Sequence, residues 1–378
     1  MRIMHLSDLH IGKRLNEFSL LEDQAYIFNQ IVDIAKEQKI EAVIIAGDVF
    51  DKSIPSSAAV QLFDDFLNEW HELNLPVFII SGNHDSAERV AFGGRLFEQS
   101  GIYISPVYDG HIKQIALTDD FGNINFYLLP FIKPSAVRPF FPELQIDTYN
   151  DAVKAALDGL PVNPEERNIL VAHQFVTGAA VSDSEEIFVG GLDNIAAELF
   201  EAFDYAALGH IHTPQKIGRE SVRYCGTPLK YSFSEAAQDK SVTIIDFKEK
   251  GSLTVETHPL MPKHDLRKIK GLYNDLVSRG SYSEENRYDY ISATLTDEQE
   301  IPQAIAKLRV IYPNIMQLAY DNARSRISQT IESSDVSEMK TPLELFDEFY
   351  ALQNNQPMDE EQRSLMAQLI SSIWEEKA

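Results

Sequence analysis

The first part of the chain alternates between short apolar runs and longer segments with helical spacing. In segment 20–38 apolar residues recur every three or four positions, and segment 56–73 repeats this pattern, so both are expected to be helices. Strands alternating with helices are typical of a layered α/β domain, which is expected over residues 1–261. The apolar runs that predict buried strands lie at 4–6, 42–46, 77–80, 169–172, 205–208 and 242–247.

Residues from about 100 to 165 interrupt this alternation. Prolines stand at 130, 134, 139 and 142, and they predict an irregular excursion from the layered domain. After Pro259 and Pro262, which mark a linker, the alternation restarts. Strands at 267–270, 288–295 and 315–320, with helices at about 272–279 and 301–311, predict a small α+β domain over residues 262–323.

The end of the chain reads as a polar linker followed by two helices. Residues 324–340 have little to bury and predict a linker. In segment 341–378, Thr341-Pro342-Leu343-Glu344 is a capping-box pattern with proline at the first helical position. Two such helices cannot bury their apolar stripes alone, so they either dock back on the main domain or bind in a groove of another chain. The long polar linker favours the second interpretation.

Composition limits the class of protein. The 378 residues carry a net charge of −25, which argues against general electrostatic adhesion to nucleic acid but does not exclude a nucleic-acid substrate. One cysteine, Cys225, excludes an internal disulfide framework and fits a reducing compartment. No signal peptide or apolar run of membrane-spanning length is visible, so a cytoplasmic protein without membrane contact is expected.

Five short motifs place a His, Asp or Asn directly after a predicted strand. In an open α/β sheet, ligands bind outside the carboxyl ends of the strands, so these side chains are expected to converge on one site. The motifs are Asp8-Leu9-His10, Gly47-Asp48, Gly82-Asn83-His84-Asp85, Ala172-His173 and Gly209-His210-Ile211-His212.

These motifs supply oxygen and nitrogen ligands without sulfur, a set that suits Mn²⁺, Fe or Zn²⁺. Taken alone, an Asp at a strand end is more often a turn or capping residue, and a lone His is usually a packed structural residue. Together the residues favour a metal site. They are too many for one ion with open positions, whereas two ions roughly 3.5–4 Å apart, bridged by one carboxylate, would use them all. The candidate ligands are Asp8, His10, Asp48, Asn83, His173, His210 and His212.

The pattern Asp-x-His, Gly-Asp-x-x-Asp, Gly-Asn-His-Asp, His and Gly-His-x-His resembles the calcineurin-like metallophosphoesterase superfamily. Within it, the chain is similar to the SbcD family of bacterial nuclease subunits. The similarity is carried by Met1-Arg-Ile-Met-His-Leu-Ser-Asp-Leu-His, Ala46-Gly-Asp-Val-Phe-Asp, Ala207-Leu-Gly-His-Ile-His and Arg223-Tyr-Cys-Gly-Thr-Pro. In the catalytic domain the similarity rests on specific motifs. In the second domain and the terminal helices it rests on the order of the predicted elements. It implies a sandwich of sheets flanked by helices, with a small α+β capping domain and a C-terminal helical pair.

The resemblance implies two Mn²⁺ per subunit, with Mg²⁺ or another divalent ion as the alternative. Asp8, His10 and His212 would bind one ion, Asn83, His173 and His210 the other, and Asp48 would bridge them. A water held by the ions would attack phosphorus in line.

Three further residues receive roles from the resemblance. His84 would stabilise the transition state or protonate the leaving oxygen. Asp85 is expected to orient His84, and Asp51 to have a similar positioning role.

The implied function is that of a DNA nuclease subunit, with double-strand exonuclease and single-strand or hairpin endonuclease activity in DNA end processing, repair, recombination and replication. The implied partners are DNA, an SbcC-type ATPase subunit bound by residues 341–378, and a second copy of the chain in a homodimer within a heterotetramer. The apolar residues of segment 56–73 are candidates for the dimer contact, and the basic residues of the second domain for contacts to DNA phosphates. The candidates for the dimer contact are Phe63, Phe66, Leu67 and Trp70. The candidates for contacts to DNA are Arg267, Lys268, Lys270, Arg324 and Arg326.

Two alternatives remain open at the level of sequence. A metallophosphoesterase acting on nucleotides or cyclic nucleotides would use the same metal ligands, although it would not need the second domain or the terminal helices. A non-catalytic scaffold would be expected to have lost ligands, and none is missing from the motifs.

Overall fold

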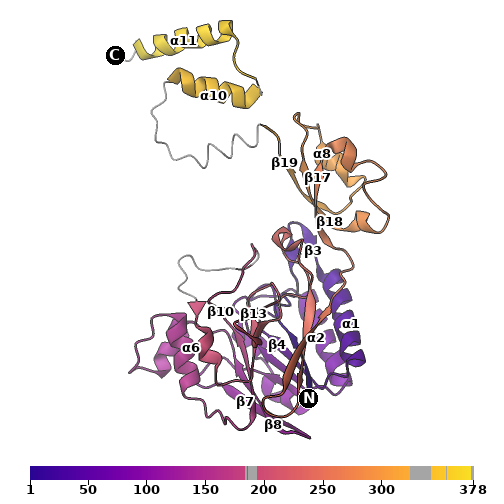
Figure 1. Ribbon diagram of the computed structural model, residues 1–378, viewed down its shortest axis with the longest axis vertical. Helices are drawn as coiled ribbons and strands as arrows, with labels where there is room; N and C mark the ends of the chain where they lie inside the picture. The colour runs from indigo at the N-terminus through magenta and orange to yellow at the C-terminus, as the bar shows by residue number, and fades with distance from the viewer. Residues whose placement is uncertain (184, 186–193, 324–341, 355, 376–378) are drawn as a thin grey trace. The chain divides into compact units, whose positions relative to one another are not determined.

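The computed structural model describes residues 1–183, 185, 194–323, 342–354 and 356–375 (Figure 1). Its contacts divide the chain into one unit from Met1 to Leu266 and a second from Arg267 onwards. The boundary expected at 261/262 lies just before this division. The expected linker at 324–340 lies outside the described residues.

Two six-stranded sheets form the centre of the first unit. In order across the sheet, the first contains β16 (Leu253–Pro259), β15 (Ser241–Phe247), β1 (Arg2–Leu6), β4 (Ala42–Ala46), β5 (Val77–Ile80) and β6 (Ile102–Ile104). The second contains β13 (Gln215–Ile217), β14 (Arg219–Tyr224), β12 (Tyr205–Gly209), β9 (Arg167–His173), β8 (Gly122–Leu129) and β7 (Lys113–Asp119). Two small sheets pair β2 (Arg14–Leu15) with β3 (Phe18–Ser19) and β10 (Phe175–Val176) with β11 (Asn194–Ile195).

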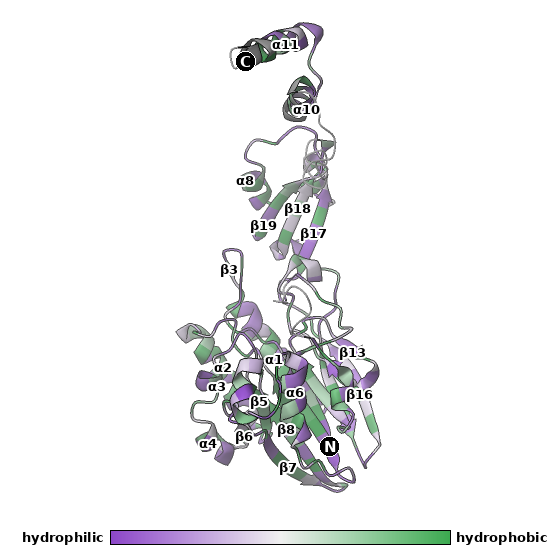
Figure 2. Cartoon of the chain, turned by 90° about the vertical axis from the view of Figure 1, so that its left-hand side faces the viewer, coloured by the Kyte–Doolittle hydropathy of each residue, from purple (hydrophilic) through white to green (hydrophobic). Residues whose placement is uncertain are grey.

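The central strands of both sheets run parallel, and the antiparallel pairs lie at the edges. β1, β4, β5 and β6 are parallel neighbours, as are β8, β9, β12 and β14. Parallel strands are usually buried on both faces, which explains why the predicted runs are continuously apolar. Every residue of β4, β5, β9 and β12 is buried. Figure 2 shows hydrophobic residues along strands in the interior of this unit.

The two sheets pack face to face around an apolar core, in which the rings of Phe78 and Phe126 stack 3.9 Å apart. Helices α1 (Leu21–Glu37) and α2 (Ser57–Glu72) lie on one side of the sandwich, and α6 (Tyr149–Asp158) lies on the other (Figure 1). The predicted fold class, a sandwich of sheets flanked by helices, is confirmed. Short helices complete the unit: α3 (Ala87–Val90), α4 (Gly94–Phe97), α5 (Pro134–Val137), η1 (Glu98–Ser100), η2 (Arg138–Phe140), η3 (Ala197–Phe200) and η4 (Phe233–Glu235).

The expectation of an irregular excursion at 100–165 is wrong for most of that segment. It contains β6, β7, β8 and α6, and α6 begins at a capping box between Thr148 and Asp151. The prolines instead mark element ends, since Pro130 follows β8 and Pro134 is the first residue of α5. β7 escaped prediction because it is a half-exposed edge strand, in which alternation replaces a continuous apolar run.

The apolar face of α2 packs within its own chain. Phe66 and Trp70 are 3% and 0% exposed, and the Phe66 ring stacks on Phe28 of α1. Phe63 and Leu67 are half-buried, and the Phe63 ring contacts Phe50. Phe66 and Trp70 therefore stabilise the first unit, whereas Phe63 and Leu67 keep part of their surface exposed on α2.

The second unit contains a three-stranded sheet, and its apolar side chains pack with those of two short helices. The sheet orders β17 (Leu266–Gly271), β18 (Tyr290–Leu295) and β19 (Ile315–Tyr320), and the helices are α7 (Tyr273–Leu276) and α8 (Ala304–Arg309), with η5 (Asn286–Tyr288) between β17 and β18. All three strands were expected from the sequence. Both helices are shorter than expected: α7 ends before Ser278 and Gly280, and α8 begins after Pro302.

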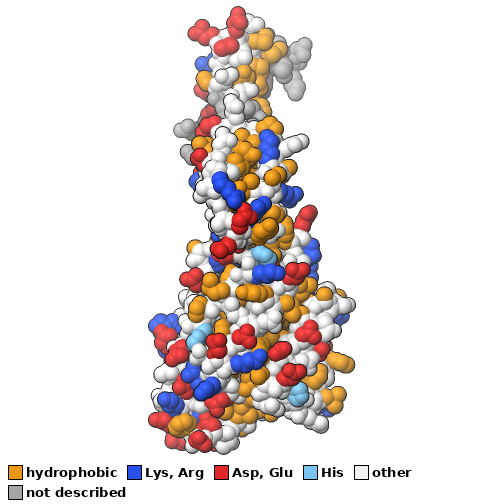
Figure 3. Space-filling model, turned by 90° about the vertical axis from the view of Figure 1, so that its right-hand side faces the viewer, with side chains coloured by type: hydrophobic (Ala, Val, Ile, Leu, Met, Phe, Trp, Pro, Cys, Tyr) orange, Lys and Arg blue, Asp and Glu red, His pale blue; other side chains and the backbone are white. Residues whose placement is uncertain are grey.

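Two helices, α10 (Pro342–Asn354) and α11 (Glu360–Glu375), lie near the end of the chain and contact each other through an ion pair between Arg363 and Asp347 at 2.8 Å. Phe349, Leu365 and Leu369 are about half exposed. Among the helices that the structure describes, none is both long and apolar enough to cross a membrane. Acidic and basic side chains are interspersed over the face shown in Figure 3.

Candidate metal centre

The side chains of the five sequence motifs meet at the carboxyl ends of strands from both sheets. Asp8 and His10 follow β1, Asp48 follows β4, and Asn83 follows β5 in the first sheet. In the second sheet, β9 ends at His173, and His210 and His212 follow β12. All seven candidate ligands are brought together, and all but the half-buried Asn83 are buried.

One group of donors is formed by Asp8, His10 and His212, whose ligand atoms lie within 4.8 Å of one another. The Nε2 atoms of His10 and His212 are 3.2 Å apart. His10 Nε2 also lies 3.6 Å from Asp48 Oδ2. Ring nitrogens that face each other at this distance fit ligation of a shared cation.

A second group lies on the other side of Asp48. Its Oδ2 is 3.3 Å from Nε2 of His173, and the same ring nitrogen is 3.0 Å from Oδ1 of Asn83. That amide oxygen is also 2.9 Å from Nδ1 of His210. Asp48 therefore lies between two sets of donors.

The backbone is strained where it presents these side chains. Asp8, His10, Asp48 and His210 have φ values of 52°, 43°, 46° and 103°, which non-glycine residues rarely adopt. Such conformations persist only where the surroundings hold them, and they cluster at functional sites. Here the amide of His210 donates to Asp8 Oδ1 at 3.0 Å, and the amide of His84 donates to Asp48 Oδ1 at 2.9 Å. In each case the carboxylate of one turn accepts a hydrogen bond from the backbone of another turn and so holds that turn in place.

Two glycines leave the room that the cluster needs. A Cβ on Gly209 would lie 1.9 Å from the carbonyl oxygen of Ala46 and 2.7 Å from Nδ1 of His173. A Cβ on Gly82 would lie 2.1 Å from Oδ1 of Asp48. Gly209 therefore allows the ends of the two sheets to approach closely, and Gly82 allows the turns after the neighbouring strands β4 and β5 to do so.

The electrostatics of the cluster centre on Asp48. Burial acts to raise the pKa of Asp48, but the charge and hydrogen bonding of His173 outweigh it and hold the pKa well below its usual range. Burial disfavours the charged form of His173, but the Asp48 carboxylate raises its pKa to about 9. In the metal-free protein the two residues are therefore an ion pair.

Burial favours the neutral form of three other groups in the cluster, His10, His210 and Asp8. Burial lowers the pKa of His210 to about 3 and that of His10 well below its usual value. Burial also raises the pKa of Asp8. Neutral imidazole is the form that binds a metal ion, so His10 and His210 have donor atoms ready.

His84 differs from the other histidines of the cluster because it is half-buried. Its ring lies 4.8 Å from that of His10, measured between centroids, and its Nδ1 is 3.3 Å from the carbonyl oxygen of Asp51. A ligand atom of His84 also lies within 4.8 Å of His10 and Asp48. It is therefore placed to reach a group bound at the cluster.

The contacts of Asp85 differ from the role expected for it. Its carboxylate accepts hydrogen bonds from the amides of Gly82, Val49 and Phe50, at 2.9, 3.0 and 2.9 Å. Burial, followed by the charge of Asp48, raises its pKa to about 6. Asp85 therefore joins the turns after β4 and β5, whereas the His84 ring faces the backbone of Asp51.

Several residues around the cluster carry no motif that sequence reasoning could detect. The ammonium of Lys13 lies 2.8 Å from Asp51 Oδ1. The side-chain amide of Gln24 donates to the carbonyl oxygen of His10 at 2.8 Å, and the hydroxyl of Tyr231 donates to that of Leu9 at 2.6 Å. Glu185 accepts from the amide of His212 at 2.8 Å. Each lies far in sequence from the motif residue it contacts or belongs to a loop without periodicity.

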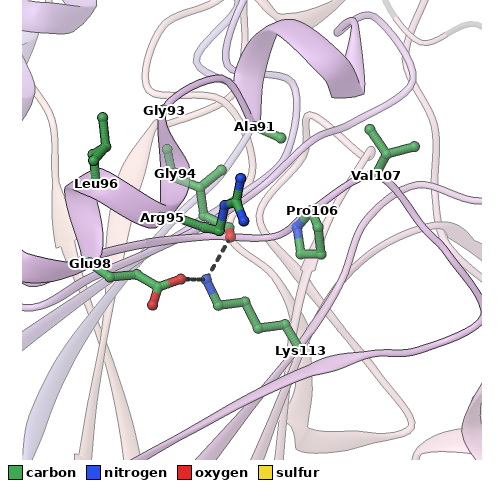
Figure 4. A pocket seen from close by; sticks show the side chains of 10 residues that line it. Ala91, Gly93, Gly94, Arg95, Leu96, Glu98, Pro106, Val107 and Lys113 are labelled. Atoms are coloured by element: carbon green, nitrogen blue, oxygen red, sulfur yellow. Dashed lines mark hydrogen bonds and ion pairs between the residues drawn. The ribbon is translucent and has the colours of Figure 1, made fainter.

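A groove of about 860 Å³ lies elsewhere on the first unit, beside α4 (Figure 4). It is lined by Arg95, Leu96 and Val107, among other residues, and by no candidate metal ligand. Within it, Lys113 pairs with Glu98 at 2.5 Å (Figure 4). The groove is therefore separate from the metal cluster.

Comparison with known proteins agrees with this arrangement. Residues 1–214 match the model of the calcineurin-like phosphoesterases, and residues 262–354 match the SbcD_C model, described as the type 5 capsule protein repressor C-terminal domain. The chain is 32% identical to the D subunit of the nuclease SbcCD from Staphylococcus epidermidis, over 99% of each chain.

Two solved structures also share similarity with the chain. One is a dimetal phosphatase from Danio rerio, with a TM-score of 0.43 and 12% identity over 68% of this chain and 96% of the phosphatase. The other is a protein of Thermus thermophilus, with a TM-score of 0.36 and 10% identity over 68% of this chain and 98% of that protein. The family matches along the sequence establish the relationship: the chain belongs to the SbcD family, and its amino-terminal domain is a calcineurin-like phosphoesterase.

Proposed function

We propose that the chain is a metal-dependent DNA nuclease subunit that hydrolyses phosphodiester bonds in DNA end processing and repair, as a double-strand exonuclease and a single-strand or hairpin endonuclease. The observation that carries the proposal is the position of Asp48 between two sets of buried donors. The name of the Staphylococcus epidermidis relative, a nuclease subunit, supports DNA as the substrate.

The proposed centre holds two divalent cations, with Mn²⁺ as the proposed ion. The donor set fits, because it consists of carboxylate, amide and imidazole groups whose ligand atoms converge. Such cations supply a nucleophilic hydroxide at neutral pH and neutralise charge on the phosphate oxygens. The proposed ligands are Asp8, His10 and His212 for one ion and Asn83, His173 and His210 for the other, with Asp48 shared.

The residues around the cations have distinct proposed roles. His84, half-buried beside His10, hydrogen-bonds the phosphate or gives a proton to the leaving oxygen. Asp85 keeps the turns after β4 and β5 together, which fixes Asp48 and Asn83. Asp51 positions His84 through its backbone carbonyl and holds Lys13 through its carboxylate.

Replacing His84 with glutamine is expected to lower the rate of Mn²⁺-dependent DNA cleavage by about 10²-fold or more, because proton transfer or phosphate stabilisation is lost. Mn²⁺ binding should persist, since the proposed ligands are unchanged. The measurement is cleavage of linear duplex and hairpin DNA by the full chain. His111→Gln is the matched control, because His111 is exposed at the surface.

The same assay decides whether the proposed substrate is right. A parent protein that leaves both DNA forms intact in Mn²⁺, with and without its ATPase partner, would contradict the nuclease proposal. If that protein instead turns over nucleotides efficiently, the phosphoesterase chemistry stands and only the DNA substrate is wrong.

The protonated state of His173 predicts pH-dependent metal binding. With a pKa of about 9 in the metal-free protein, its ring carries a proton at neutral pH that a cation must displace. Apparent Mn²⁺ affinity should therefore increase as the pH rises towards about 9, by up to about tenfold per pH unit for each proton released. Calorimetric titration at about pH 6 and about pH 8, in buffers of different ionisation enthalpy, measures both affinity and proton release. Equal affinities without proton release would contradict this expectation.

The domain roles complete the proposal. Residues 1–261 are the nuclease domain and 262–323 a capping domain that contacts DNA. In the second unit Arg267 and Lys270 pair with Asp289 and Asp321 at 2.6 and 2.5 Å, whereas Lys268 is exposed on the same strand. Arg324 and Arg326 lie outside the described residues. The assembly proposed is a cytoplasmic heterotetramer of two such chains and two ATPase subunits.

Residues 341–378 are proposed to bind an SbcC-type ATPase subunit through the apolar faces of α10 and α11. Deleting them is expected to abolish co-purification with that subunit, because half-exposed Phe349, Leu365 and Leu369 would be lost. The measurement is a pull-down of the ATPase by the full chain and by residues 1–340. Leu365→Ala with Leu369→Ala should weaken the same contact, whereas Gln368→Ala on the same helix should not. Retention of the ATPase by residues 1–340 would place the contact elsewhere.

A further inference from the structure

A buried ion pair lies behind one of the proposed metal ligands. Glu235, the last residue of η4, is 0% exposed, and Lys240 is 5% exposed. The ammonium of Lys240 lies 2.5 Å from Oε2 of Glu235. Removing two charges from water costs free energy, which their attraction offsets only with good geometry and further hydrogen bonds. The other contacts of Glu235 and Lys240 therefore indicate which part of the protein the pair stabilises.

Both charged groups face the same histidine. The second carboxylate oxygen, Oε1 of Glu235, lies 3.9 Å from Nδ1 of His212. Lys240 donates to the backbone carbonyl of His212 at 2.9 Å and to Oε1 of Gln238 at 3.0 Å. Glu235 thus lies beside the imidazole ring of His212, and Lys240 hydrogen-bonds the backbone of the same residue.

The opposite edge of that ring faces the metal cluster, since His212 Nε2 is 3.2 Å from His10 Nε2. A neutral imidazole carries its proton on one nitrogen and a lone pair on the other. A carboxylate beside Nδ1 favours the proton there, which leaves the lone pair on Nε2 for a cation. A carboxylate behind a ligand histidine also fixes the orientation of the ring.

We propose that Glu235 is a positioning residue that keeps His212 in the tautomer and orientation needed to bind a metal ion through Nε2, and that Lys240 holds the Glu235 carboxylate and the His212 backbone in place. This inference rests on the proposed metal function. Neither residue belongs to a sequence motif of the cluster: Glu235 is the last residue of η4, and Lys240 directly precedes β15.

Glu235→Gln tests the proposal because it keeps the size of the side chain and removes its charge. Direct Mn²⁺ titration of the full chain should show two sites in the parent protein. In the variant, one site should weaken by about 10- to 100-fold and the other should keep its affinity. A merely structural ion pair would not distinguish between the two sites.

A double variant separates the proposed effect on metal binding from an effect of misfolding. Glu235→Gln alone leaves the buried ammonium of Lys240 without its carboxylate, whereas Glu235→Gln with Lys240→Met removes both charges. The double variant should show the same loss at one site and a parent-like circular dichroism spectrum. Lys113→Met is the matched control, because it breaks another 2.5 Å ion pair, in the separate groove beside α4 (Figure 4), and should leave both sites unchanged.

Two results would overturn the inference: a folded variant that binds both ions like the parent, or one that loses affinity equally at both sites. Either would leave the proposed nuclease function standing. A parent protein that binds no Mn²⁺ would instead overturn the metal function and this inference together.

Discussion

Replacing Asp48 with asparagine is expected to reduce Mn²⁺-dependent DNA hydrolysis by at least about 10⁴-fold, which corresponds to a loss of about 5 kcal/mol or more of transition-state stabilisation. The reason is the position of its carboxylate, 3.6 Å from His10 Nε2 and 3.3 Å from His173 Nε2. A neutral amide cannot bridge two cations as a carboxylate does. Asparagine can still accept the hydrogen bond from the His84 amide, so the fold should be kept.

Two measurements check this expectation: the initial cleavage rate on duplex DNA and the number of Mn²⁺ ions bound. Both should fall together, because Asp48 is the proposed shared ligand. Asp158→Asn is the control, since this carboxylate is 61% exposed on α6, where it pairs with Lys154. A variant that retains two bound ions and cleaves within about tenfold of the parent rate would show that Asp48 does not bridge the ions.

Adding a single methyl group at Gly209 is expected to be nearly as damaging. The Cβ of an alanine there would meet the backbone oxygen of Ala46 at 1.9 Å and the His173 ring at 2.7 Å. A backbone atom cannot move aside as a flexible side chain can, so the ends of β12 and β4 must separate. Such overpacking costs about 3 kcal/mol or more.

The expected results for Gly209→Ala are a melting temperature lower by about 6 °C or more and a loss of at least about 10²-fold in cleavage rate. The rate falls because His173 and His210 move relative to the first sheet, and small misplacements of catalytic groups are costly. Gly159→Ala provides the matched control, because nothing lies within 4 Å of the added Cβ and its backbone φ is −89°. Equal stability and activity in both variants would contradict the close approach of the two sheets.

Much of the fold could be predicted from local pattern because parallel strands are buried on both faces. The apolar runs at 42–46, 77–80 and 169–172 correspond to β4, β5 and the centre of β9. The same reasoning missed β7, whose exposed side leaves a weaker pattern, and it also missed β8, although most of that strand is buried. It also misread the prolines near 134, which mark the start of a short helix.

The contacts of the outer residues could not be predicted. Asp85 follows His84 directly in the chain, and the family resemblance implied that it orients the ring. Its carboxylate instead accepts hydrogen bonds from backbone amides, two of them more than thirty residues away at Val49 and Phe50. Of the four apolar residues of α2 that were candidates for a dimer contact, Phe66 and Trp70 pack inside their own chain, while Phe63 and Leu67 are only half-buried.

The sequence by itself determined which side chains would converge at one place, because each lies directly after a strand and strand ends share one edge of a sheet. Only the tertiary structure decided that Asp48 lies between two sets of donors and that Glu235 and Lys240 lie behind His212. The physical reason is that these contacts join strands of two different sheets and loops without periodicity. Their geometry depends on how the sheets pack, which no local pattern encodes.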